Sequence, residues 1–139
     1  MTESVRILVA DDDPDLLELL RLNLEAEGHA VMVACDGTEA LEMAIVSRPD
    51  LLVLDVMMPG LDGLEVTRKL RERPETSGLP IVLLTARGSN PEILEGWQSG
   101  ADYYITKPFE LEHLLYFIEL MQEKAKRDSL RTDPALAAP

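Results

Sequence analysis

Five short apolar runs, each followed by a stretch with helical periodicity, restrict the fold of this chain more than any other feature. The runs lie at residues 5–10, 30–34, 51–55, 80–84 and 103–106. The helical patterns begin after Asp13, Asp36, Asp62, Asn90 and Pro108, and they end before Gly28, before Pro49, near Arg73, before Gly100 and near Lys126. Most of the runs are apolar without alternation, which is typical of parallel strands covered on both faces. The sequence therefore predicts an α/β fold with a doubly wound, five-stranded parallel sheet.

Composition supports a single domain and argues against two kinds of partner. Of the 139 residues, 46% are hydrophobic but only 4% are aromatic, so the core is expected to be aliphatic. The net charge of -13 opposes binding to nucleic acid or to an anionic membrane surface, because both require a positive face. No apolar run approaches the roughly 20 residues of a membrane helix, no signal peptide is evident, and the lone Cys35 cannot form an internal disulfide. We therefore expect a cytoplasmic protein.

Residues 127–139 differ from the rest of the chain. They are poor in large apolar residues, and they end in a segment that contains Pro134 and Pro139. Such a composition is typical of a flexible tail or a linker. We therefore expect one domain at residues 1–126, followed by a tail or linker at residues 127–139.

Polar side chains follow four of the predicted strands at their carboxyl ends. They are Asp11 and Asp12 after the first strand, Asp55 at the end of the third, Thr85 after the fourth and Lys107 after the fifth. In an open parallel sheet the ligand site lies at these ends. If the first and third strands are neighbours, three carboxylates converge, and their mutual repulsion favours a bound divalent cation. Magnesium suits such a site because it takes few protein carboxylates and leaves positions for phosphate oxygens.

A role in phosphoryl transfer fits the remaining groups of this set. Lys107 offers a fixed positive charge and Thr85 a hydroxyl donor, and both suit a transferring phosphoryl group. Asp55 would then be the nucleophile and form an aspartyl phosphate. Taken alone, each residue also has a structural explanation: Asp55 as a turn former, Thr85 as a strand end and Lys107 as a solvated side chain. The two histidines, His29 and His113, are expected to be structural or exposed.

The motifs around these residues resemble the receiver domain of two-component response regulators, the CheY-like family. They lie at residues 7–12, 54–63, 84–86 and 105–109, and their order and spacing together are specific. The resemblance extends from residue 5 to about residue 126. It implies a flavodoxin-like (βα)5 fold with the strand order 2-1-3-4-5. It also implies a signalling domain that is not an enzyme, although it assists its own phosphorylation and dephosphorylation.

The resemblance assigns roles to particular residues. Asp55 would receive the phosphoryl group from a histidine kinase or a histidine phosphotransfer protein. Asp12, Asp55 and the main-chain carbonyl of Met57 would bind Mg²⁺ or Mn²⁺, with Asp11 acting through water. The family usually has a cis bond at the position of Lys107–Pro108, which the sequence permits.

Further residues would respond to the phosphoryl group or control its lifetime. Thr85 would move onto the group, Lys107 would pair with it, and Tyr104 would change rotamer. Met57 and Arg87 would border the path of the hydrolytic water. Because Met57 cannot orient a water by hydrogen bonding and Arg87 is bulky and cationic, we expect a long-lived phosphoryl group.

The face expected to report the phosphoryl state surrounds Tyr104 and combines the fourth helix, the fifth strand and the fifth helix. In receivers of winged-helix transcription factors this face dimerises through pairs of acidic residues and arginines. This chain lacks the basic half of that pattern, since Phe117 and Glu119 stand near the expected arginines. Tyr103, Tyr116 and Phe117 offer aromatic surface, which is compatible with core packing but is also of the kind that anchors interfaces. We therefore expect phosphorylation to change the affinity for a different, unidentified protein, without direct contact to nucleic acid or membrane.

Two alternative functions are open on the sequence alone. A haloacid-dehalogenase-like phosphatase also has an aspartate nucleophile after a parallel strand, but that family places a second aspartate where this chain has Met57. A pseudo-receiver, which is a binding module that never takes phosphate, would normally lack Asp55, Asp12 or Lys107. All three are present, so the phosphoacceptor interpretation fits the residues best.

Overall fold

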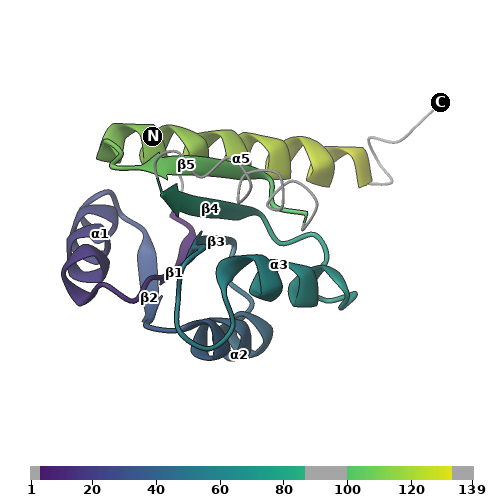
Figure 1. Ribbon diagram of the computed structural model, residues 1–139. Helices are drawn as coiled ribbons and strands as arrows, with labels where there is room; N and C mark the ends of the chain where they lie inside the picture. The colour runs from purple at the N-terminus through teal and green to yellow at the C-terminus, as the bar shows by residue number, and fades with distance from the viewer. Residues whose placement is uncertain (1–3, 87–99, 133–139) are drawn as a thin grey trace. The chain divides into compact units, whose positions relative to one another are not determined.

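The computed structural model describes residues 4–86 and 100–132, with side chains described up to residue 123. The chain divides into two compact units, Met1–Phe109 and Glu110–Pro139. The first contains the sheet and the helices labelled α1, α2 and α3 in Figure 1, and the second contains helix α5. The helix predicted between Asn90 and Gly100 lies outside the described residues.

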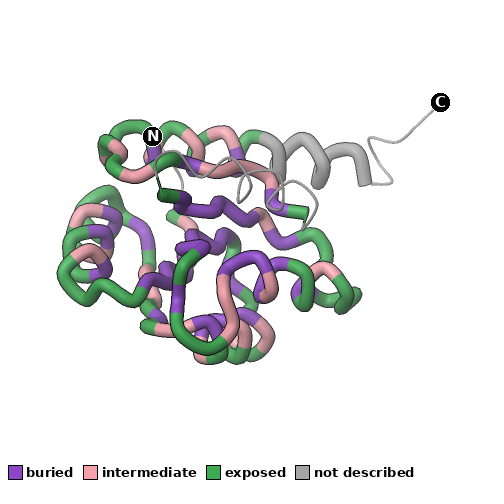
Figure 2. Tube along the Cα trace, in the orientation of Figure 1, coloured by how far each residue is buried: buried purple, intermediate pink, exposed green. Residues whose placement is uncertain are grey.

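A five-stranded parallel sheet organises the first unit. Its strands are β1 (Arg6–Ala10), β2 (Ala30–Ala34), β3 (Leu51–Asp55), β4 (Ile81–Ala86) and β5 (Tyr103–Lys107). They lie in the order β2-β1-β3-β4-β5, and every pair is parallel. All five residues of β3 are buried, which explains its unbroken apolar run (Figure 2). The predicted doubly wound α/β fold and its strand order are confirmed.

Aspartates cap the amino ends of the three helices that the structure describes in the first unit. These helices are α1 (Pro14–Ala26), α2 (Gly37–Ser47) and α3 (Gly63–Arg71). Asp13 caps α1 by accepting the main-chain N–H of Asp15 at 3.0 Å, and Asp36 caps α2. Asp62 forms a capping box with Glu65 at the start of α3. These carboxylates satisfy N–H groups that a helix end otherwise leaves without partners, so the predicted starts are confirmed.

Helix α5 (Leu111–Thr132) is longer than the sequence analysis predicts. The sequence predicts that this helix ends near Lys126, whereas in the structure it continues to Thr132. That residues 127–139 serve as a tail or linker stays a prediction. Residues 111–133 contain no glycine or proline, so no helix-breaking residue precedes Pro134 in this segment. Between residues 111 and 123, where side chains are described, the buried apolar side chains of α5 share one face, at Leu114, Ile118 and Met121.

The sheet of the first unit has helices on both faces. Alternate side chains of a strand point to opposite faces, and Leu8, Leu52 and Leu83 belong to a core cluster that includes buried residues of α2 and α3. The buried leucines of α1 are not part of this cluster. Figure 1 shows α2 and α3 together on one side, with α1 apart from them. The sheet therefore lies between helices on its two faces, and the carboxyl ends of its strands lie along one edge of the sheet.

Candidate functional site

The strand register brings Asp11 and Asp55 to the same edge of the sheet. β1 pairs with β3, and Ala10 lies opposite Leu54, so the next residue of each strand emerges beside the other. Asp11 is completely buried and Asp55 is 5% exposed, whereas Asp12 is exposed. The sequence prediction depended on the first and third strands being neighbours, and the structure meets this condition.

The carboxylates of Asp11, Asp12 and Asp55 form one cluster. One ligand oxygen from each of them lies within 4.8 Å of the others. Asp11 Oδ1 also accepts the main-chain N–H of Asp13 at 2.9 Å, which orients the buried carboxylate. The carboxylate of Asp13 itself points elsewhere, because it caps α1. A hard divalent cation such as Mg²⁺ prefers oxygen ligands of this kind, so the donor set fits the expected metal.

Lys107 brings the balancing positive charge from the end of β5. Its Nζ donates to Asp11 Oδ2 at 2.8 Å and lies 3.3 Å from Asp55 Oδ2. The bond that follows, Lys107–Pro108, is cis. The ammonium group therefore touches two of the three clustered carboxylates, as expected of a residue that pairs with a phosphoryl group on Asp55.

The electrostatics of the cluster favour a proton or a cation. Burial, with the charge of Asp11 as a second cause, raises the pKa of Asp55 to about 6, although Lys107 and the Met57 N–H act in the opposite direction. Burial also acts to lower the pKa of Lys107, but Asp11 and Asp55 outweigh it, so the pKa of Lys107 is raised. Lys107 thus stays charged at neutral pH, while the Asp55 carboxylate holds its charge less readily than an ordinary aspartate.

Thr85 adds a hydroxyl group that forms no hydrogen bond with any other described group. It lies on β4, one residue beyond Leu84, which is the register partner of Asp55. Its side chain is buried, and Thr85 Oγ1 has no hydrogen-bond partner within the described part of the chain. A buried hydroxyl without a partner costs free energy, and an oxygen-rich ligand beside Asp55 would remove this cost.

Three other residues of the predicted site are placed less completely. The side chain of Met57 is 60% exposed, and its main-chain N–H donates to Asp55 Oδ1 at 3.4 Å. Tyr104 lies on β5 and is half-buried against the core cluster. Arg87 lies outside the described residues. The metal ligation by the Met57 carbonyl, the rotamer change of Tyr104 and the effect of Arg87 on hydrolysis therefore stay predictions.

The sequence analysis missed the part that Gly63 plays at this site. A Cβ atom at Gly63 would lie 2.4 Å from the main-chain oxygen of Asp55, which is closer than a carbon atom can approach. Only glycine therefore lets α3 begin this close to the end of β3. The signal in the sequence is the pair Asp62-Gly63, which was interpreted only as the start of a helix.

Arg71 and Asp102 form a second arrangement that the sequence analysis missed. Arg71 donates to the carbonyls of Leu79 at 2.6 Å and Gly100 at 2.9 Å, and to Asp102 Oδ2 at 3.1 Å. Asp102 Oδ2 also accepts the main-chain N–H of Ile81 at 2.8 Å. The carboxylate of Asp102 thus bonds to two residues of its own unit.

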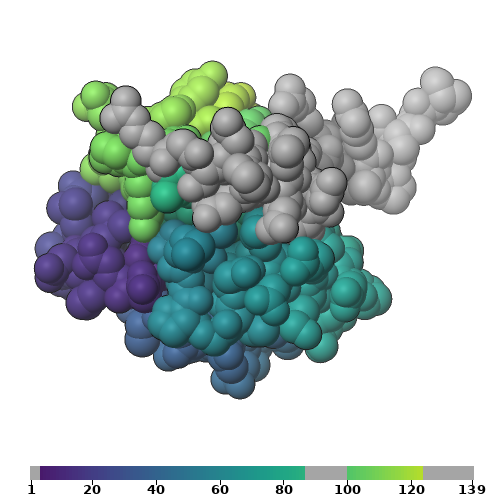
Figure 3. Space-filling view, in the orientation of Figure 1, coloured from purple at the N-terminus to yellow at the C-terminus, as the bar shows by residue number. Residues whose placement is uncertain are grey.

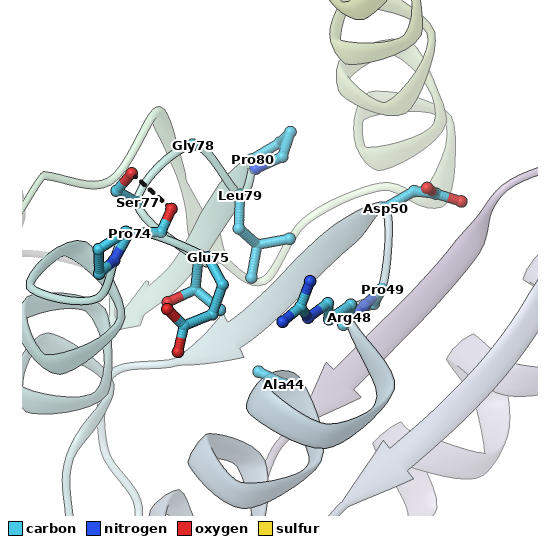
Figure 4. Close-up of a pocket in the computed structure, with 11 residues that line it drawn as sticks. Ala44, Arg48, Pro49, Asp50, Pro74, Glu75, Ser77, Gly78, Leu79 and Pro80 are labelled. Atoms are coloured by element: carbon cyan, nitrogen blue, oxygen red, sulfur yellow. Dashed lines mark hydrogen bonds between the residues drawn. The ribbon is translucent and has the colours of Figure 1, made fainter.

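A cavity of about 530 Å³ lies at the opposite ends of β3 and β4. The end of α2 and the connection from α3 to β4 form its walls, and Arg48, Glu75 and Leu79 are among its lining residues (Figure 4). None of the clustered aspartates lines it. The cavity is therefore separate from the cluster of Asp11, Asp12 and Asp55.

Comparison with known protein families decides the class of this site. The model of the response regulator receiver domain matches residues 7–119. The chain belongs to this family. It is a receiver domain of a two-component response regulator, which decides against a haloacid-dehalogenase-like phosphatase. A receiver domain is a signalling module and not an enzyme in the ordinary sense.

Relatives of this receiver domain include longer response regulators. It is 52% identical to the response regulator MprA of Mycobacterium ulcerans over 132 residues, which cover 95% of this chain and 55% of that protein. It is 47% identical to the phosphate regulon transcriptional regulatory protein PhoB of Rhizobium meliloti over 128 residues, which cover 91% of this chain and 56% of that protein. The receiver domain thus spans little more than half the length of these curated relatives.

Solved structures agree with the assignment of this receiver domain. The chemotaxis response regulator CheY4 of Vibrio cholerae matches with a TM-score of 0.80 and 31% identity, covering 86% of this chain and 99% of that chain. A two-component response regulator from Clostridium difficile matches with a TM-score of 0.80 and 29% identity, covering 86% and 97% of the two chains. Within the described residues, no helix has the length and apolarity needed to cross a membrane.

Proposed function

We propose that this receiver domain accepts a phosphoryl group on Asp55 from a histidine kinase or a histidine phosphotransfer protein, with Mg²⁺ or Mn²⁺ as cofactor. The convergence of three carboxylates and Lys107 around a buried Asp55 supports the proposal most strongly. The proposal includes a cytoplasmic location, because the lone Cys35 suits a reducing compartment.

Asp55 acts as the nucleophile in this reaction. One of its carboxylate oxygens forms a bond to phosphorus while the bond between phosphorus and the donor imidazole nitrogen breaks. The imidazole leaves with the electron pair, and no net oxidation or reduction occurs. Burial makes the Asp55 carboxylate less well solvated than an aspartate in water, which favours its use as a nucleophile.

The neighbouring residues manage the negative charge of the phosphoryl group. Asp12, Asp55 and the main-chain carbonyl of Met57 would hold the metal ion, and Asp11 would act on it through water. The bound ion supplies positive charge to the phosphoryl oxygens. Lys107, which already lies 3.3 Å from Asp55 Oδ2, pairs with the same oxygens, and Thr85 Oγ1 donates a hydrogen bond to them.

The test is the intact mass of the protein after incubation with acetyl phosphate. With Mg²⁺ the mass should rise by one phosphoryl group, and with EDTA it should stay unchanged. Asp55→Asn should abolish the gain in the presence of Mg²⁺. An Asp55→Asn protein that gains phosphate with the wild-type yield would show that the site is assigned wrongly. A wild-type protein that never gains phosphate would favour the pseudo-receiver alternative.

A further inference from the structure

The loop between β3 and α3, residues 56–62, leads directly away from the acidic cluster. It begins after Asp55, contains Met57 and contributes to the blue-green surface in Figure 3. Its last part is fixed at α3, where the Gly63 N–H donates to the carbonyl of Val56 at 2.9 Å. Because a Cβ at Gly63 would collide with Asp55, the loop is held tightly at this end.

The middle of the loop lies against the first turn of α2. The main-chain N–H of Gly37 donates to the carbonyl of Pro59 at 3.4 Å. A Cβ atom at Gly37 would lie 1.7 Å from the carbonyl oxygen of Leu61. One residue earlier in the loop, Gly60 has a φ of +76°, and a Cβ there would lie 3.3 Å from Thr38 Oγ1. The contact between these segments is therefore one of main chain against main chain, and it requires glycine at residue 37.

Helix α2 is less able to yield at this contact than the loop. Ala40 and Ala44 are completely buried in the core cluster, and the carboxylate of Asp36 caps the helix by accepting the N–H of Glu39 at 2.8 Å. In contrast, the loop residues Met57 and Pro59 are exposed. A side chain added at residue 37 would thus displace the loop and not the helix.

We infer that Gly37 is a positioning residue for the metal site, because its missing side chain lets α2 hold the β3–α3 loop, and with it the main-chain carbonyl of Met57, in place. This inference rests on the proposed binding of Mg²⁺ at the acidic cluster. Gly37 itself touches neither the metal nor the phosphoryl group. It acts through the loop, as residues that orient metal ligands commonly do.

A competing possibility is that the loop is anchored closer to the site. Met58 is only 8% exposed and belongs to the core cluster, so it alone could fix Met57. In that case a displacement at Leu61 would end at Pro59 and leave the metal ligand in place. The two possibilities differ in the affinity for Mg²⁺ and not in the stability of the fold.

Calorimetric titration of the whole chain with Mg²⁺ separates the two possibilities. Gly37→Ala should weaken Mg²⁺ binding by about tenfold. Gly78→Ala is the matched control, because a Cβ at Gly78 meets nothing within 4 Å, and it should leave the affinity unchanged. In phosphorylation by acetyl phosphate, Gly37→Ala should require more Mg²⁺ for the half-maximal rate but approach the wild-type rate at saturation. A merely structural role would not raise the Mg²⁺ requirement while leaving the rate at saturating Mg²⁺ unchanged.

A second pair of variants decides the matter if Gly37→Ala does not fold. Gly60→Ala adds a Cβ 3.3 Å from Thr38 Oγ1, so it disturbs the neighbouring contact between the loop and the first turn of α2. Gly28→Ala is its control, since both glycines have a positive φ but Gly28 has open space around it. The inference predicts weaker Mg²⁺ binding for Gly60→Ala alone. Wild-type affinity in a folded Gly37→Ala or Gly60→Ala protein would overturn it. A wild-type protein that binds no Mg²⁺ would instead refute the metal site of the proposed function.

Discussion

Asp55 is costly to ionise, because its carboxylate is buried beside that of Asp11. Its pKa is raised from 3.8 to about 6, so between these values the folded protein binds more protons than the unfolded chain. The free energy of unfolding should therefore fall as the pH rises from about 4 to 6. For a rise in pKa from 3.8 to about 6, the contribution of Asp55 is on the order of 3 kcal/mol.

Asp55→Asn should remove this contribution. Urea unfolding of both proteins in EDTA, at several pH values between 4 and 7, measures it as the difference between the two curves. The wild-type protein should lose stability relative to Asp55→Asn as the pH rises, and Mg²⁺ should restore the loss at pH 7. Parallel curves would contradict the raised pKa.

We expect Met57, together with Arg87, to influence the lifetime of the phosphoryl group on Asp55. Its side chain is 60% exposed and cannot orient a water molecule. Met57→Asn combined with Arg87→Glu should speed dephosphorylation by about tenfold, because an amide and a carboxylate can position the attacking water. Phosphate-release assays measure the rate, and Met57→Leu is the control that should leave it unchanged. Equal dephosphorylation rates of the double variant and the wild type would show that Met57 and Arg87 do not control hydrolysis.

At the scale of elements, Arg71 and Asp102 connect the end of α3 with the beginnings of β4 and β5. Asp102→Ala would leave the N–H of Ile81 and the guanidinium of Arg71 without this acceptor. It should lower the free energy of unfolding by about 1–3 kcal/mol. Chemical denaturation measures the loss, and Glu42→Ala, at an exposed position of α2, is the control. A stability equal to that of Glu42→Ala would show that the link contributes little.

Local patterns allowed most elements to be predicted, whereas close approaches between distant segments could not be. The caps at Asp13 and Asp62 and the polar strand ends leave a signal within a few neighbouring residues. The strand order came from the family resemblance and not from the residues alone. The contact of Gly37 with Leu61 leaves no local pattern, because the distance between them depends on how α2 packs. The reach of Arg71 to Asp102 spans 31 residues and was missed for the same reason.

For the molecule as a whole, we expect that phosphorylation does not produce the dimer of winged-helix transcription factors, which is held by pairs of acidic residues and arginines. Asp102 bonds within its own unit, and α5 presents Tyr116, which is 57% exposed. The ring of Phe117 lies beside that of Tyr116, and the ring of His113 lies beside that of Phe117. Aromatic surface of this kind is common where a different protein binds. Sedimentation velocity with Mg²⁺ and beryllofluoride, a phosphoryl mimic, should show a monomer. A dimer whose formation depends on concentration and beryllofluoride would contradict this prediction.

The central claim is that Asp55 alone accepts the phosphoryl group and that it needs the divalent cation to do so. Borohydride reduction after incubation with acetyl phosphate tests it directly, because it converts an aspartyl phosphate into homoserine at the modified position. Peptide mapping by tandem mass spectrometry should find homoserine at residue 55 with Mg²⁺ and none with EDTA. Homoserine at residue 11 or 12, or an equal yield at residue 55 in EDTA, would contradict the account.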